Sequence, residues 1–191
     1  DGSKRAYNRD LVKAITNEIN KEFELKSKFL IIIQILEFIK KEDTITQDEI
    51  NFVDYVSAHL MIDHKVYHEL KTFSLYNPVN VKDKSQLLVI DGRDESIYEG
   101  GKHLKNDNQG VEIFVLRIKL ISSFLFRYSG PRNLYLNGHK VAQNRCGILP
   151  FGGVLKTSRI APIYYSQIIS KFILKKGQPK IRYFARDIEY K

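Results

Sequence analysis

The sequence predicts a mixed α+β protein in which a helical N-terminal half precedes a strand-rich C-terminal half. Apolar residues recur every three or four positions between Leu11 and Phe73, which is the period of a helix. From Gln86 onward they alternate in short runs between turn residues, as in antiparallel sheets. Residues 1–78 carry 11 Lys and Arg against 13 Asp and Glu, whereas the rest of the chain carries 20 against 9. We therefore expect a helical bundle over residues 1–78 and an antiparallel β-sandwich or barrel over residues 79–178.

Two helices are expected first, at residues 11–24 and 26–41. The second is apolar on almost every side between Phe29 and Ile39, so it should lie at the centre of the bundle with neighbours on most faces. This run of 11 residues is too short to cross a membrane, which requires about 20 mostly apolar residues.

Two shorter helices should complete the bundle. The segment TITQDEI predicts a helix start with Thr46 as N-cap and Glu49 reaching back to it, an arrangement called a capping box. The fourth helix should open at Asp63. The residues expected to be buried are Phe52, Val53, Val56 and Leu60 in the third helix and Val66, Leu70 and Phe73 in the fourth.

Short alternating segments predict the strands of the C-terminal half. Asn137 and Gly138 are typical of a two-residue type I′ turn, which places a hairpin there. The pair Gly152 and Gly153 should lie in a bend between two further strands. The expected strand segments are QLLVID (86–91), VEIFVLRIKL (111–120), SSFLFRY (122–128), LYLNGHKV (134–141) and GILPFGGVLKT (147–157).

The last part of the sequence predicts a strand to Tyr165, a short helix capped by Ser166, and a final strand over residues 181–190. The final strand alternates apolar and polar residues but has no evident pairing partner in the chain. Because an unpaired strand edge is normally covered, we expect residues 179–191 to begin a further domain of a longer protein.

The turn KEDTITQDE between two apolar helices resembles that of the TerB-like helical family, with Asp43, Thr46 and Glu49 at the family's acidic and capping positions. The resemblance covers roughly residues 25–75 and implies a divalent metal site. His64 and His68, one helical turn apart, are further candidate ligands. A capped helix start and surface histidines remain the alternative interpretation, since the turn lacks the glycine and the second oxygen ligand of a calcium loop.

The run LYLNGHKVAQNRCGILPFGGVLK resembles the closing strands of FHA-type β-sandwiches. That resemblance implies phosphopeptide binding, for which Arg127, Ser129 and Asn133 are the nearest candidates, although their spacing departs from the family's pattern. The segment GGVLKT is not a phosphate-binding P-loop, because two residues separate Gly153 from Lys156.

The final segment KIRYFARDIEYK resembles the first strand of an ABC-transporter ATPase domain, and the order of parts resembles the N-terminal cytoplasmic region of bacterial ABC transporter ATP-binding proteins. This implies that ATP and Mg²⁺ bind in a downstream domain, with a membrane permease on the same chain, at the cytoplasmic side of the inner membrane. We find no Walker or transporter signature motif in the 191 residues, so we expect this part to be a non-catalytic regulatory or scaffolding module without a cofactor of its own. The alternatives are a stand-alone TerB-like metal- or ligand-binding protein and an FHA-type phosphopeptide-binding module.

The cysteine count and the distribution of basic residues indicate the compartment and the kind of partner. The single cysteine, Cys146, excludes an internal disulfide and suits a reducing compartment. The basic residues of the C-terminal half are scattered, whereas nucleic-acid binders carry a clustered basic stripe, so we expect no nucleic-acid partner. We expect contacts with other protein surfaces instead.

Overall fold

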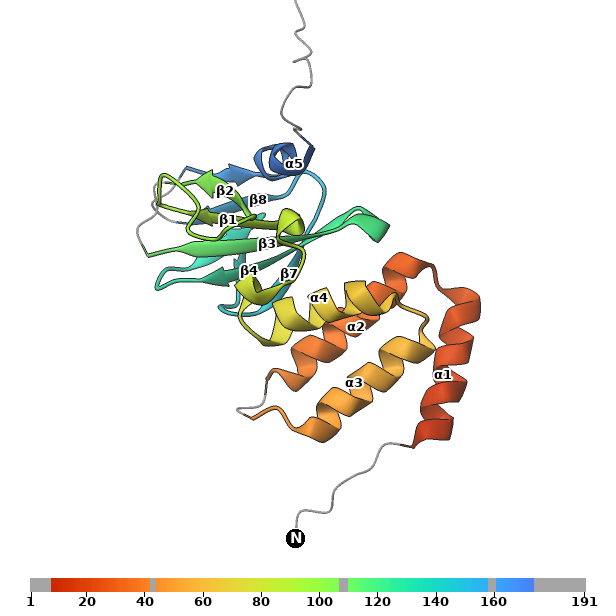
Figure 1. Cartoon of the computed structure of the whole chain (residues 1–191). Helices are drawn as coiled ribbons and strands as arrows, with labels where there is room; N and C mark the ends of the chain where they lie inside the picture. Colours follow the sequence, from red (N-terminus) through yellow and green to blue (C-terminus); the bar gives the residue numbers. More distant parts are fainter. Residues whose placement is uncertain (1–7, 42–43, 107–109, 158–160, 174–191) are drawn as a thin grey trace, which may run out of the picture.

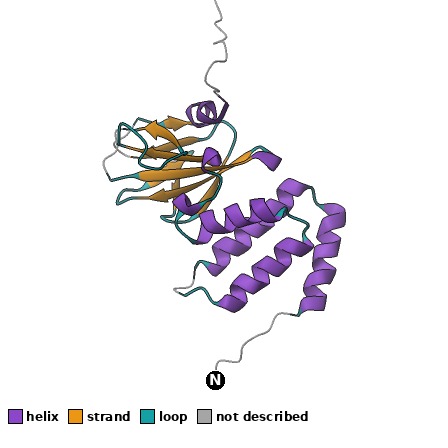
Figure 2. Cartoon of the chain, in the orientation of Figure 1, coloured by secondary structure: helices purple, strands orange, loops and turns teal. Residues whose placement is uncertain are grey.

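The computed structural model describes residues 8–41, 44–106, 110–157 and 161–173. Four helices form the N-terminal part, and two sheets of mostly antiparallel strands with a fifth helix form the C-terminal part (Figures 1 and 2). The α+β class expected from the sequence is confirmed. No helix in these ranges is long and apolar enough to cross a membrane.

The helical part contains the four helices at the expected places. Thr46 and Glu49 form the predicted capping box, and Asp63 caps the last helix by accepting a hydrogen bond from the Val66 N–H at 3.0 Å. Such caps satisfy backbone donors that have no partner within the first helical turn. The helices are α1 (Arg9–Glu22), α2 (Leu25–Ile39), α3 (Gln47–His59) and α4 (His64–Leu75).

Helix α2 buries one broad side rather than its whole circumference. Phe29, Ile32 and Leu36 are fully buried, but Phe38 is 68% exposed. As expected, α2 has neighbours on most faces, which are α3, α4 and the sheet, and the side that carries Phe38 is the exposed one.

The C-terminal part contains two sheets. The first has the strand order β2-β1-β3-β4-β7 and the second the order β6-β5-β8-β9; all neighbours are antiparallel except β1 and β2. The helix α5 (Tyr165–Ile173) packs beside β2 and β9. The strands are β1 (Leu87–Asp91), β2 (Lys102–Lys105), β3 (Glu112–Ile118), β4 (Ser123–Ser129), β5 (Leu134–Leu136), β6 (His139–Val141), β7 (Cys146–Leu149), β8 (Val154–Thr157) and β9 (Ile163–Tyr164).

The predicted turns are present. Asn137 and Gly138 both have positive φ, 49° and 85°, so the β5–β6 hairpin turn is of type I′ as expected. The bend at Gly152 and Gly153 separates β7 from β8, and it carries the chain from the first sheet to the second.

Three details differ from the expectations or fall outside them. Strand β2 was not predicted, since KHLK lacks β-branched residues, and it pairs in parallel with β1. Helix α5 begins at Tyr165, so Ser166 lies inside it rather than capping it; Gln167 Oε1 accepts from the Tyr164 N–H at 2.9 Å instead. The strand expected at residues 181–190 lies outside the described residues.

Strand β1 is buried on both faces and joins two hydrophobic cores. Leu87 and Val89 belong to a core shared with the helices, whereas Leu88 and Ile90 face the core between the two sheets. This follows from the two-residue period of a strand, which sends successive side chains to opposite faces. The helical and strand parts are thus held together by one continuous apolar contact; the boundary at residue 78 remains a prediction.

Candidate functional site

The candidate metal ligands are not gathered at one point in the described structure. Asp43 lies outside the described residues. Glu49 is occupied by the capping box, where its Oε2 accepts from the Thr46 N–H at 2.7 Å. His64 and His68 lie one turn apart on α4. Among the described residues, no three His, Cys, Asp or Glu side chains are placed to hold a metal ion, so the metal hypothesis remains a prediction.

The candidate phosphopeptide residues are spread over β4 and the loop after it. Arg127 donates to the carbonyl oxygen of Phe73 at 3.1 Å and to that of Tyr76, near the C-terminal end of α4. A cation at this end of a helix is favourable because the unpaired carbonyls carry partial negative charge. Ser129 lines a hollow beside Arg127, whereas Asn133 is exposed in the following loop and does not line it. Phosphopeptide binding also remains a prediction.

A polar cluster, here called the seam cluster, joins the helices to the first sheet. Arg145 Nε lies 2.6 Å from Glu37 Oε2, and the Glu37 side chain is only 7% exposed. Among the described residues neither Glu37 carboxylate oxygen has a hydrogen-bond partner, so the contact with Arg145 is an ion pair. Lys40 Nζ donates to the Ser74 carbonyl oxygen at 2.7 Å. The seam cluster comprises Glu37, Lys40, Ser74, Arg127, Arg145 and Cys146.

Burial shifts the pKa values of three seam groups, lowering those of Lys40 and Arg127 and raising that of Cys146. The pKa of Lys40 is lowered by burial and then by the nearby positive charge of Arg127. Burial, followed by the negative charge of Glu37, raises the pKa of the Cys146 thiol to about 12. A thiol with this pKa stays protonated at neutral pH and is a poor nucleophile.

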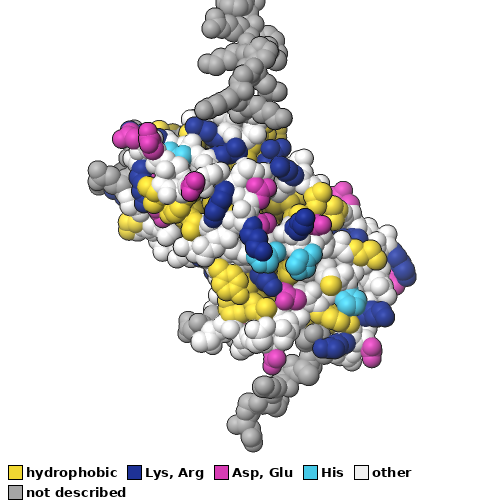
Figure 3. Space-filling view, in the orientation of Figure 1, with side chains coloured by type: hydrophobic (Ala, Val, Ile, Leu, Met, Phe, Trp, Pro, Cys, Tyr) yellow, Lys and Arg dark blue, Asp and Glu magenta, His cyan; other side chains and the backbone are white. Residues whose placement is uncertain are grey.

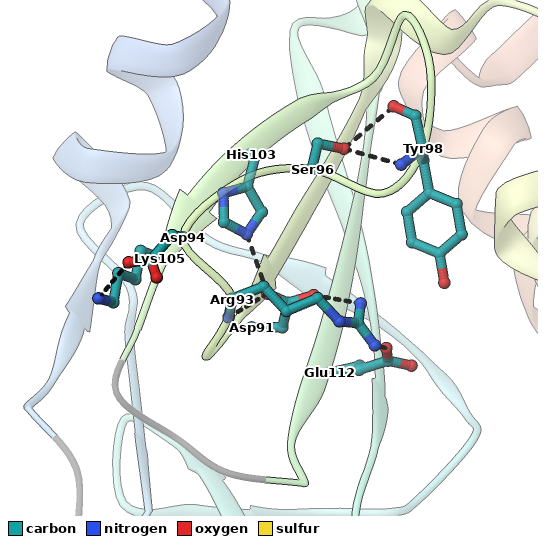
Figure 4. A network of polar contacts seen from close by, with 8 residues as sticks. All are labelled: Asp91, Arg93, Asp94, Ser96, Tyr98, His103, Lys105 and Glu112. Atoms are coloured by element: carbon teal, nitrogen blue, oxygen red, sulfur yellow. Dashed lines mark hydrogen bonds and ion pairs between the residues drawn. The ribbon is translucent and has the colours of Figure 1, made fainter.

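A second polar network fixes the long loop between β1 and β2 (Figure 4). Asp91 accepts from the Arg93 N–H at 2.9 Å and from Arg93 Nη1 at 2.7 Å, and His103 Nε2 lies 2.9 Å from its Oδ1. Arg93 also reaches Glu112 Oε1 at 2.9 Å. The hydrogen bond to Glu112 is the main cause of the raised pKa of Arg93. Because both oxygens of the buried Asp91 are engaged, this carboxylate holds the loop in place.

A concave surface lies between α4 and the end of β3, and we name it the α4–β3 groove. Its volume is about 440 Å³, within the range of about 300–1,000 Å³ that is typical of ligand pockets. Both parts of the chain build it: α4 forms one wall, while β3 and the 3₁₀ turn Lys119–Ile121 form the other. Its apolar lining consists of Val66, Leu70, Leu116, Ile118 and Leu120.

Charged side chains surround this apolar lining. In Figure 3, Lys, Arg and His side chains gather with apolar ones in the middle of the molecule, where Figure 1 places α4 beside the sheet. His64 and His68 are part of this rim. The cations that line the α4–β3 groove are Lys65, Lys82, Arg117 and Lys119, and the carboxylates are Glu69 and Asp83.

Sequence reasoning found some of these residues and missed others. It selected His64 and His68, but as metal ligands rather than as the rim of a groove. Lys82 and Leu120 were not selected, because nothing local marks them: one precedes a strand and the other follows one. The signal that was present is the pattern of Arg117 and Lys119 alternating with apolar residues at the end of β3.

No protein-family model, curated protein or solved structure matches this chain. No family membership follows from these comparisons. The α4–β3 groove is therefore interpreted from its own residues, their burial and their charges.

Proposed function

We propose that this chain is a non-catalytic interaction module that binds another protein surface through the α4–β3 groove. The observation that carries the proposal is the composite origin of the groove. Its two walls come from different parts of the chain, and the shared core and the seam cluster hold these parts together. A concave surface with an apolar lining and a charged rim has the composition of a protein-binding site.

The order of parts supports a more specific role. We propose that residues 1–78 form a TerB-like bundle, that residues 79–178 form an FHA-like sandwich, and that residues 179–191 lead into an ABC ATPase domain. In this proposal ATP and Mg²⁺ bind downstream, a membrane permease follows on the same chain, and the module lies on the cytoplasmic side of the inner membrane. The module would then regulate or scaffold the ATPase.

The coding sequence beyond Lys191 tests the transporter assignment. A Walker A motif soon after this residue is the expected result, and a stop codon there would overturn the assignment.

The regulatory role is tested on the longer protein. We expect purified full-length protein to hydrolyse ATP, residues 1–191 alone to show no hydrolysis, and deletion of residues 1–178 to change the hydrolysis rate without abolishing nucleotide binding. An unchanged rate would leave the module without a regulatory effect on the ATPase and would contradict the proposal.

A further inference from the structure

The α4–β3 groove combines an apolar interior with an excess of positive charge. Leu70, Leu116 and Ile118 are buried side chains that form its base, while Leu120 is 56% exposed at the rim. An exposed leucine beside buried aliphatic residues offers apolar surface that a bound segment could cover. The groove can therefore take up a few apolar side chains.

Two carboxylates in the lining are already engaged by backbone donors. Glu69 accepts from the Lys82 N–H through both oxygens, at 3.1 and 2.9 Å. Asp83 accepts from the Ser85 N–H at 3.1 Å and from the Ser85 hydroxyl at 2.5 Å. These contacts hold the loop after α4 and leave neither carboxylate paired with a lining cation.

Among the described residues, the four cations of the lining have no acidic partner. Within the described residues, none of Lys65, Lys82, Arg117 and Lys119 forms an ion pair with Asp or Glu, although ion pairs occur elsewhere on the surface. With four cations against two carboxylates, the lining carries a net charge of +2 without its histidines. An occupant with negative charge would complement it.

We propose that the α4–β3 groove binds a short acidic segment of a partner protein that carries apolar side chains. This inference rests on the proposed interaction function and specifies the chemistry of the partner. Aliphatic side chains of the segment would fill the base, and its Glu or Asp residues would pair with the rim cations. Binding of this kind follows the general mode in which an amphipathic segment lays its apolar face into a groove.

The geometry favours a protein segment over other anions. Single-stranded nucleic acid is bound by aromatic side chains on which bases stack, whereas the lining here is aliphatic. A bilayer attracts basic residues on a flat or protruding surface, whereas Leu70, Leu116 and Ile118 lie at the bottom of a hollow. Both classes nevertheless serve as competing probes in the experiment below.

The experiment measures binding of fluorescent peptides to the whole chain by anisotropy. The probes are short peptides with Glu and Leu at helical or at alternating spacing. One matched set replaces Leu by Ser, and another replaces Glu by Lys. We expect only the Glu–Leu peptides to bind, and we expect their affinity to fall with added salt because rim charges are screened.

Variants locate the site. Lys82→Glu and Lys119→Glu, both at exposed positions, should each weaken binding about tenfold, since reversal replaces an attraction by a repulsion. Leu120→Ser should weaken it by removing apolar contact. Lys140→Glu makes the same charge change on exposed β6, outside the groove, and should leave affinity unchanged. Circular dichroism of each variant checks that the fold is retained.

Several results would overturn the inference. These are absence of binding by every Glu–Leu peptide, equal loss in the Lys140 variant, and tighter binding of oligonucleotides or anionic vesicles than of peptides. If peptides fail to bind while deletion of residues 1–178 still changes the ATPase rate, the proposed interaction function is supported and only the proposed partner chemistry is wrong. If peptides bind but the rate does not change, the partner chemistry stands without the regulatory role.

Discussion

Removing one partner of the ion pair between Glu37 and Arg145 should destabilise the fold strongly, because the pair joins α2 to the first sheet in a largely buried place. The two side chains are 7% and 27% exposed, and their charged atoms lie 2.6 Å apart. Removing one partner of a fully buried pair costs about 3–5 kcal/mol, whereas an exposed pair contributes about 0–1 kcal/mol. Because Arg145 is partly exposed, we expect Glu37→Leu to lower the free energy of unfolding by about 3 kcal/mol, at the low end of the buried range.

A double-mutant cycle measures this contribution. Glu37→Leu leaves the cations Lys40, Arg127 and Arg145 without their carboxylate, and Arg145→Met leaves the buried carboxylate without its closest cation. The double variant replaces the pair by apolar side chains and should cost about 2 kcal/mol less than the sum of the two single variants, which is the coupling energy of the pair. Urea unfolding followed by circular dichroism gives each free energy of unfolding.

An exposed ion pair provides the matched control. Lys21 Nζ lies 2.7 Å from Glu18 Oε1, but both side chains are more than 60% exposed. The same cycle there should give a coupling of about 0.5 kcal/mol or less. If both cycles give equally small couplings, burial does not strengthen the contact between Glu37 and Arg145, and the reasoning is refuted.

Three further predictions concern single residues. Cys146 should resist iodoacetamide at pH 8 in the folded protein and react fully in urea. The pKa of the Cys146 thiol is about 12 in the fold and exceeds the usual 9.0, so the unfolded state loses this proton first. The free energy of unfolding should therefore fall as pH rises from 9 to 12, by about 1 kcal/mol at pH 10. Cys146→Ala should remove this pH-dependent loss of stability. Gly147→Ala should lower the free energy of unfolding in urea by about 1–3 kcal/mol, since the added Cβ would lie 2.6 Å from the ring of Phe126. As a control, Gly138→Ala meets no atom within 4 Å and should cost only the strain of its positive φ, about 1 kcal/mol. Thr46→Ala should lower the free energy of unfolding by about 1 kcal/mol through loss of the helix cap, and an effect no larger than that of Thr44→Ala would contradict this.

The features predicted correctly are those with local causes. The capping box at Thr46 and Glu49 depends on two residues three positions apart, and the hairpin depends on the conformations that Asn137 and Gly138 tolerate. The predicted bounds of the helices agree with the observed ones within a few residues, because each helix carries its own apolar stripe.

The features that were missed depend on contacts between distant parts of the chain. Burial of Glu37 makes sense only once Arg145, more than a hundred positions later, lies beside it. Strand β2 forms because β1 offers it an edge, not because its own residues favour a strand. The groove likewise needs Leu120 and Lys82 to meet α4, which no local pattern records.

The sharing of one core by both parts limits how this protein can be divided or recombined. A gene fragment beginning after residue 78 would encode a sheet whose Leu87, Val89, Phe114 and Leu116 face water instead of helices. Such a product would tend to aggregate or to bind another apolar surface over the exposed face of the sheet. Evolution by shuffling, like any truncation series at the bench, would therefore have to keep the four N-terminal helices and the two sheets together.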